Sequence, residues 1–289
     1  MAISLNHRQF ERWREFIYER TGVMLGTDKA YLVEHRLAPL LEPDDQNDLG
    51  RLLLRVRDAP TSHPLCQRVI DAITTHETSW FREPKIFGLL RDSILPRLHR
   101  DIHHQRRGPV RIWSAACSTG QEPYSVAMTA LEAYRNLGGR EVCHQEVVIL
   151  ASDISRRSLQ MARRAHYDRA AVARGLDDYY LRTYFTSCGG GWQVKDEVRA
   201  MVEFRQLNLC DSLARVGLCD LVLLRNTIIY FSDEFKRGLF RRLPAVMSRG
   251  ALLFLGTGET AGHYTDAFEI IDEAGLIYYR LAEHPGHAA

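Results

Sequence analysis

Polar residues that can bind a nucleoside follow three apolar runs of the sequence. After the run at 110–114 comes AACSTGQE (115–122), whose small residues let a ligand approach the backbone and whose following helix N-terminus offers free N–H groups. Asp153 follows the run at 147–151 and can accept hydrogen bonds from two ribose hydroxyls, although it can equally cap the next helix. Arg225 and Asn226 end the run at 219–224, where a capping Asn beside packing aromatics is the alternative. No Walker-type lysine loop is present, so the three groups predict a nucleoside cofactor without a polyphosphate.

The elements that carry these residues predict an α/β fold. Short apolar strands at 110–114, 147–151, 219–224 and 251–255 alternate with helical stretches, which favours a doubly wound parallel sheet covered on both faces. In such sheets ligands bind beyond the carboxyl ends of the strands, near the switch in strand order. We therefore expect the three groups to meet at one edge.

The chain divides into three parts. Residues 1–73 have helical periodicity and no strand pattern, which predicts a small all-α N-terminal domain. Residues 74–100 are a linker and a connecting helix, and residues 101–289 form the α/β domain. Within it, extended segments around the glycines at 189–191 predict a small antiparallel insertion at about 166–207, whose last strand rejoins the main sheet.

Composition excludes several classes of protein. The 289 residues carry 38 basic and 36 acidic side chains, and a net charge of +2 argues against a nucleic-acid partner. The longest apolar runs have four or five residues, whereas a membrane helix needs about 20, so we expect no membrane insertion. The start of the chain lacks the apolar stretch of a signal peptide. Six scattered cysteines without a C-x-x-C pair indicate reduced thiols, a cytoplasmic protein and no metal site.

Several ordered motifs resemble the signatures of the CheR family of S-adenosylmethionine-dependent methyltransferases. They are WSAACSTGQEPYS (113–125), SDIS (152–155), LNL (207–209), RNTIIYF (225–231) and LGTGE (255–259), with the linker motif TTHETSWFR at 74–82. The resemblance runs from about residue 21 to residue 280. It implies a Rossmann-like methyltransferase domain that esterifies glutamate side chains of bacterial chemoreceptors (methyl-accepting chemotaxis proteins) for sensory adaptation. S-adenosylhomocysteine is the implied product.

The resemblance also implies a set of site residues. Tyr230 is the candidate for orienting the substrate carboxylate, with Arg82 assisting, and a purely structural role for Tyr230 stays equally open. His76 stands where the family usually has Asn. The cofactor-binding residues that the resemblance implies are His76, Thr78, Arg82, Glu122, Asp153, Asn208, Leu209, Arg225 and Asn226.

The substrate-docking surface and the pathway are less well defined. Arg51 and Arg55 are spaced i, i+4 on a predicted helix, which suits the Glu-rich cytoplasmic helical region of a chemoreceptor but also an ordinary solvated face. Two other functions stay open: a non-catalytic, cofactor-binding adaptor of a chemosensory array, and a small-molecule carboxyl methyltransferase. The array itself, flagellar or of the type IV pilus branch, is also open.

Overall fold

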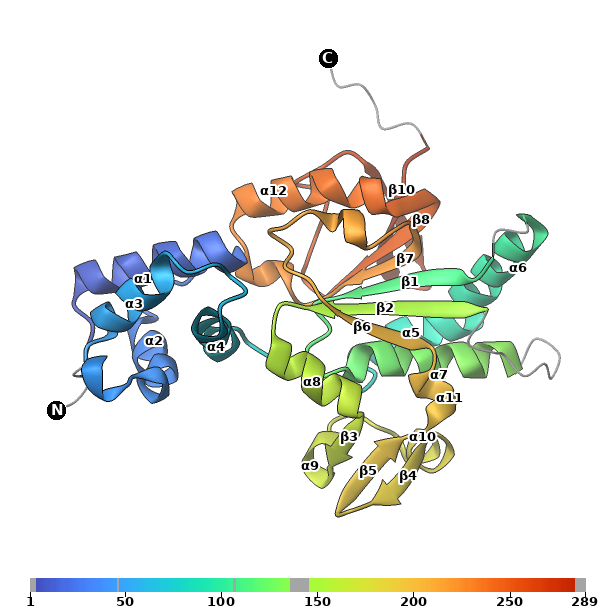
Figure 1. Ribbon diagram of the computed structural model, residues 1–289. Helices are drawn as coiled ribbons and strands as arrows, with labels where there is room; N and C mark the ends of the chain where they lie inside the picture. Colours follow the sequence, from blue (N-terminus) through green and yellow to red (C-terminus); the bar gives the residue numbers. More distant parts are fainter. Residues whose placement is uncertain (1–3, 46, 106–107, 136–145, 284–289) are drawn as a thin grey trace.

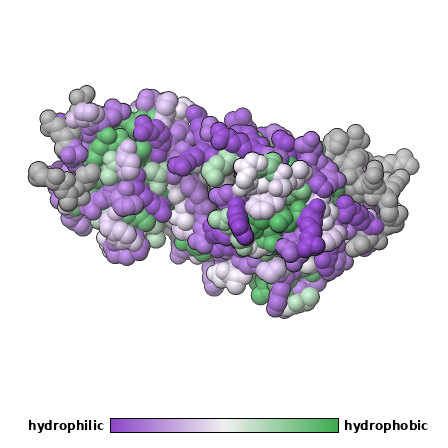
Figure 2. All heavy atoms as spheres, turned by 90° about the horizontal axis from the view of Figure 1, so that it is seen from below, coloured by the Kyte–Doolittle hydropathy of each residue, from purple (hydrophilic) through white to green (hydrophobic). Residues whose placement is uncertain are grey.

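The computed structural model describes residues 4–45, 47–105, 108–135 and 146–283, which form a helical lobe and a larger α/β lobe (Figure 1). Seen from below, the surface is mostly hydrophilic, with an apolar patch near the middle of the larger lobe (Figure 2). Across the described ranges, no helix is both long and apolar enough to cross a membrane.

The helical lobe confirms the predicted all-α N-terminal domain. Asn6 caps the first helix through a capping box with Gln9. The apolar residues of that helix recur every three or four positions, and Trp13 is fully buried at their centre. Burial of each such side chain contributes about 1.5–3 kcal/mol. The elements are α1 (His7–Thr21), α2 (Ala30–Leu37), α3 (Leu49–Arg57) and α4 (Pro64–Ile73), with 3-10 turns η1 (Ala38–Leu40) and η2 (Pro43–Asp45).

A long helix follows the linker between the two lobes and packs within the α/β lobe. The sequence predicts one helix at 84–100, and the structure has a continuous one with a π-helical segment in its middle. Leu90 and Ile94 of this segment are fully buried in the core of the α/β lobe. The parts are α5 (Pro84–Leu89), η3 (Leu90–Ile94) and α6 (Leu95–Gln105).

A seven-stranded sheet forms the centre of the larger lobe, in the order β6-β2-β1-β7-β8-β10-β9. The first five strands of this order are parallel, and Trp113 of β1 lies opposite Leu150 of β2 and Val222 of β7. Helices cover both faces, which explains why the central strands are largely apolar, whereas β6 at the edge, VEFRQ, is not. The strands are β1 (Val110–Ala115), β2 (Val147–Asp153), β6 (Val202–Gln206), β7 (Cys219–Leu224) and β8 (Met247–Leu255). Around them lie α7 (Gln121–Arg135), α8 (Arg156–Arg164), α12 (Asp233–Arg242), and the 3-10 turns η4 (Leu213–Arg215), η5 (Ile228–Tyr230) and η6 (Leu243–Val246).

A hairpin that was not predicted from the sequence completes this sheet. β9 (Phe268–Glu273) and β10 (Leu276–Leu281) pair antiparallel, and β10 adds to β8. The two-residue turn between them has φ of +54° at Ala274 and +74° at Gly275, as a tight hairpin turn requires. Ala-Gly is a weaker turn signal than Asn-Gly, and for this reason the sequence did not reveal it.

The predicted antiparallel insertion is a three-stranded sheet of order β3-β5-β4 below the main sheet (Figure 1). Trp80 of the linker packs against this small sheet: the centroid of its ring lies 4.8 Å from that of Tyr167 and 5.2 Å from that of Phe185. The next strand, β6, pairs parallel with β2, so the chain rejoins the main sheet as expected. The elements are β3 (His166–Asp168), α9 (Arg169–Val172), α10 (Asp178–Tyr184), β4 (Phe185–Cys188), β5 (Gly191–Val194) and α11 (Asp196–Arg199).

Gly120, in the loop after β1, allows a close approach of three elements. Its φ is +96°, and an added Cβ would lie 2.9 Å from Cβ of Ala162 and 3.0 Å from the hydroxyl of Tyr167. We predict that Gly120→Ala lowers the free energy of unfolding by about 2–4 kcal/mol, through strain and overpacking. Gly238→Ala in α12, where nothing lies within 4 Å of the added Cβ, is the matched control. It should raise stability by up to about 1 kcal/mol. Urea denaturation measures both, and equal stabilities of the two variants would show that the loop tolerates a side chain at position 120.

Candidate cofactor and substrate pocket

A cavity of about 280 Å³ opens at the carboxyl ends of β1, β2 and β7, beside the switch in strand order. The helical lobe forms its other wall through the segment after α1 and one side of α2, including Lys29 and Arg36. The residues predicted from the sequence that lie on its wall are His76, Thr78, Arg82, Glu122, Asp153, Asn208, Leu209, Arg225, Asn226 and Tyr230. The structure therefore brings these predicted residues together, whereas Arg51 and Arg55 lie outside the cavity lining.

Asp153 ends β2 and is buried at the floor of the cavity. Its Oδ2 accepts from the backbone N–H of Ser118 at 2.8 Å, and its Oδ1 accepts from that of Ser155 at 2.8 Å. Each carboxylate oxygen keeps a further lone pair, so the group can still accept from two hydroxyls. Burial raises the pKa of Asp153, although the two backbone hydrogen bonds favour its ionised form.

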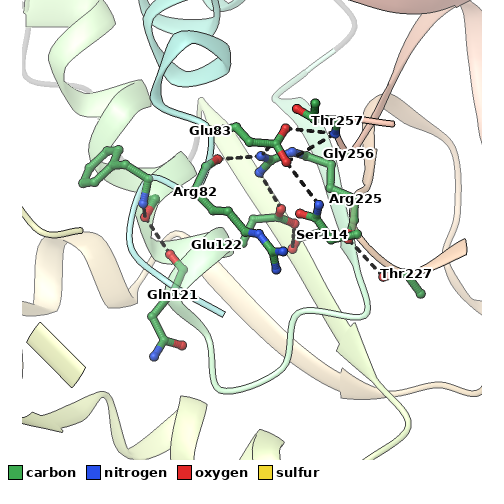
Figure 3. Close-up of polar contacts among 12 residues, drawn as sticks. Arg82, Glu83, Ser114, Gln121, Glu122, Arg225, Thr227, Gly256 and Thr257 are labelled. Carbon is green, nitrogen blue, oxygen red and sulfur yellow. Dashed lines mark hydrogen bonds and ion pairs between the residues drawn. The ribbon is translucent and has the colours of Figure 1, made fainter. Parts of the chain in front are cut away.

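Arg225, at the end of β7, lies between two carboxylates (Figure 3). Its side chain is 1% exposed, with Nη1 2.9 Å from Oε2 of Glu122 and Nη2 3.3 Å from Oε2 of Glu83. Nη2 also donates to the backbone carbonyl of Arg82, and the guanidinium lies 5.5 Å from the centre of the Phe87 ring. A buried cation with such partners has much of its donor capacity in use, so Arg225 chiefly orients Glu122 and the linker.

Glu122 begins α7 and accepts from the hydroxyl of Ser114 at 2.8 Å through Oε1. Burial raises the pKa of Glu122, against the attraction of Arg225. Arg82 makes a long 3.4 Å hydrogen bond to the carbonyl of Glu77 and is partly exposed at the cavity. Glu122, which can accept from an ammonium group, and Arg82, which can donate to a carboxylate, therefore line the same cavity.

Two of the predicted residues hold protein segments together. Nδ2 of Asn208 donates to the carbonyl of Arg20 at the end of α1, at 2.8 Å, and Oδ1 of Asn208 accepts from the N–H of Cys210. One amide hydrogen and one lone pair remain for a ligand. The ring of His76 is hydrogen-bonded to Ser158. Their neighbours Leu209, which is buried, and Thr78 add to the wall.

Tyr230 is at the mouth of the cavity and is 38% exposed. Its backbone carbonyl accepts from the N–H of Met24, at 2.8 Å, so the helical lobe holds this loop in place. The next residue, Phe231, forms an isolated antiparallel bridge with Val23. Tyr230 therefore lies at a boundary between the two lobes, where solvent reaches it.

Outside the cavity lining, Arg55 is engaged in ion pairs. Its guanidinium lies 2.8 Å from Oε2 of Glu42 and 2.8 Å from Oδ2 of Asp45. These carboxylates offset the positive charge that the sequence suggested for receptor docking. Arg51, one turn earlier, has an interaction of its own.

The donor set fits an amino-acid-bearing nucleoside. Asp153 can accept from a ribose diol, Glu122 from an ammonium group, and Arg82 can donate to a carboxylate. Among the described residues, no group of three or more His, Cys, Asp or Glu side chains is arranged to hold a metal ion.

Three residues that shape the site were not predicted from the sequence: Glu83, Ser118 and Glu259. Glu83 directly follows the linker motif, and the other two stand inside the sequence motifs named above, so their positions were visible but their roles were not. Glu259 holds the loop after β7 in place, because its carboxylate accepts from the N–H groups of Asn226 and Thr227, at 2.7 and 2.9 Å. It also accepts from those of Ile229 and Gly256.

Comparison with known proteins identifies two matching family models. One, described as the CheR methyltransferase SAM-binding domain, matches residues 76–276, and the other, the CheR methyltransferase all-alpha domain, matches residues 8–74. The chain is 39% identical to chemotaxis protein methyltransferase Cher2 of Pseudomonas putida and 40% identical to chemotaxis protein methyltransferase 1 of Pseudomonas aeruginosa. Each alignment covers 96% of this chain and 99% of the relative. Among solved structures, monomeric WbdD matches with a TM-score of 0.38 and 13% identity, over 69% of this chain and 41% of its own.

The carboxylate of Glu259 satisfies four backbone N–H groups around the pocket mouth. We predict that Glu259→Ala lowers the free energy of unfolding by about 2–4 kcal/mol, because these donors lose a charged acceptor. Glu269→Ala removes an exposed ion pair with Arg280 and should cost at most about 1 kcal/mol. Thermal unfolding of both variants tests this, and a cost for Glu259→Ala as small as that for Glu269→Ala would refute the assigned role.

Proposed function

The chain belongs to the CheR methyltransferase family, and from this premise we propose that it methylates glutamate side chains of bacterial chemoreceptors. Membership makes it an S-adenosylmethionine-dependent methyltransferase. The observation that supports the proposal best is one cavity, lined by both lobes, in which Asp153, Glu122 and Arg82 offer complementary groups for such a cofactor. Relatives at about 40% identity carry the name chemotaxis protein methyltransferase, which supports a chemoreceptor as the substrate. We further propose that the enzyme acts in the cytoplasm, on the helical region of the receptor.

The cofactor-binding roles follow from the chemistry of each side chain. Asp153 would hold the ribose hydroxyls, Glu122 the ammonium group and Arg82 the carboxylate of S-adenosylmethionine. Asn208 would use its remaining amide hydrogen and lone pair for the edge of the adenine. Leu209 would pack against that ring, while Thr78, Asn226, Arg225 and His76 complete the wall. The bound cofactor supplies an activated methyl group, and S-adenosylhomocysteine is the product.

The substrate needs little activation from the protein. A glutamate carboxylate is ionised at pH 7, so the reaction requires no strong general base. The contribution of the chain is alignment of the carboxylate and exclusion of water. Tyr230 would donate a hydrogen bond to the incoming carboxylate, with Arg82 assisting. The two lobes together would enclose the reacting groups.

Charge at the pocket mouth supports an acidic protein substrate. Lys29 and Arg36 line the cavity from α2. Arg36 donates to the carbonyls of Ile73 and Thr74, so no carboxylate offsets its charge in these contacts. Lys29 is paired with Asp28, which is 72% exposed. We propose that this wall attracts the Glu-rich receptor helix chiefly through Arg36, and that Lys29, Arg51 and Arg55 contribute less because Lys29 and Arg55 are already paired with carboxylates.

Asp153→Ala should weaken binding of S-adenosylhomocysteine about tenfold or more, because hydrogen bonds to a charged acceptor are lost. Isothermal titration calorimetry measures the dissociation constant, with Asp272→Ala in β9 as a control far from the pocket. Since burial raises the pKa of Asp153, affinity of the unaltered protein should fall on acidification at a higher pH than for an exposed aspartate. Equal binding by Asp153→Ala and the unaltered protein would exclude the ribose role.

Methyl transfer to a receptor cytoplasmic fragment tests the substrate directly. With labelled S-adenosylmethionine, the label should appear as base-labile esters on glutamates, and substitution of those glutamates should remove it. Tyr230→Phe should lower kcat about tenfold and leave the dissociation constant of S-adenosylhomocysteine unchanged, because it loses one orienting hydrogen bond. Tyr179→Phe, at an exposed position of α10 outside the cavity lining, is the control. Cofactor binding without labelling of any receptor fragment would be evidence for an adaptor instead.

A further inference from the structure

The ring of His76 has both nitrogens engaged within the protein. Nε2 lies 3.0 Å from the hydroxyl of Thr74 and 3.1 Å from the carbonyl of Asp71, and Nδ1 lies 3.1 Å from the hydroxyl of Ser158. The Thr74 hydroxyl donates to the carbonyl of Ile70, and a carbonyl only accepts, so Nε2 carries the proton. In the neutral ring Nδ1 then accepts from Ser158. No ring donor or acceptor is left for a ligand.

These partners belong to two helices that are far apart in the sequence. Asp71 is in the last turn of α4, which Thr74 follows, whereas Ser158 is in the first turn of α8 and is 2% exposed. Residues 75–79 between α4 and Trp80 form no helix or strand. The ring of His76 therefore connects the irregular linker to the α/β lobe through a hydrogen bond.

The backbone of His76 leads to the floor of the pocket. Its carbonyl accepts from the hydroxyl of Ser118 at 3.0 Å, and the backbone N–H of Ser118 donates to Oδ2 of Asp153 at 2.8 Å. Ser118 has φ of +51°, a left-handed conformation that a serine keeps only where its surroundings hold it. Displacement of the linker would release Ser118 and, with it, one of the two backbone hydrogen bonds to Asp153.

We propose that His76 is a positioning residue: its ring fixes the linker so that Ser118 holds Asp153 in the orientation that binds the ribose. This rests on the proposed cofactor binding at Asp153. This positioning role replaces the direct contact with the cofactor that the family resemblance implies for His76. Experiment can distinguish positioning from direct cofactor contact, because only the positioning role depends on the hydrogen bond with Ser158.

A double-mutant cycle of His76→Ala and Ser158→Ala separates the two roles. Each single variant should raise the dissociation constant of S-adenosylhomocysteine about threefold to tenfold, and the double variant should be no weaker than the weaker single variant. His76→Gln, which can return an N–H near the Nε2 position, should recover part of the loss. Ser212→Ala, at an exposed cap of η4, should bind like the unaltered protein. Losses that add in the double variant would indicate direct cofactor contact and overturn the proposal.

Amide hydrogen exchange supplies a readout that needs no ligand. Exchange of the Ser118 N–H should be faster in His76→Ala and in the milder Ser158→Ala, and unchanged in Ser212→Ala. If the unaltered protein fails to bind S-adenosylhomocysteine, the proposed function is wrong, and the exchange rates still decide whether His76 positions Ser118. Unchanged exchange at Ser118 in both variants would refute the positioning role.

Discussion

The site depends on the ion pairs that the buried Arg225 forms with two carboxylates. Arg225 joins Glu83 of the linker, Glu122 of α7 and the end of β7, three segments that only the folded chain brings together. A buried arginine without such partners would be strongly destabilising, so the ion pairs and the positions of these segments require one another. Glu83 itself has φ of +62°, a conformation held here by hydrogen bonds from Asn226 and Thr257. The linker is therefore joined to the pocket edge by contacts within the protein itself.

The second constraint is that the pocket belongs to both lobes. Val23 and Met24 of the helical lobe contact the backbone of Tyr230 and Phe231, and the carbonyl of Arg20 accepts from Asn208. The mouth of the cavity and the loop of the proposed substrate-orienting residue thus depend on how the helical lobe packs. The all-α domain thereby supplies the part of the cavity wall that the sheet edge leaves open.

Most of the fold could be predicted from the sequence, because both faces of the central strands are buried and their apolar runs stand out between helices. The hairpin of β9 and β10 could not, since its Ala-Gly turn is a weak signal and its strands, FEIIDE and LIYYRL, show no strict alternation of apolar and polar residues. The charge of Arg55 was also overestimated, because its partner Asp45 is 10 residues away in a separate turn. Pairing of that kind depends on packing and leaves no local pattern.

The sequence by itself determined which strand-end groups meet at the pocket. Carboxyl ends of parallel strands share one edge, so the groups after β1, β2 and β7 had to meet there once the strands were recognised. Only the tertiary structure decided what each side chain does. His76 bonds with Ser158, 82 positions away, and Asn208 with Arg20, 188 positions away. A polar side chain binds whichever partner the packing brings within about 3 Å, and that choice is not written in the spacing of any motif.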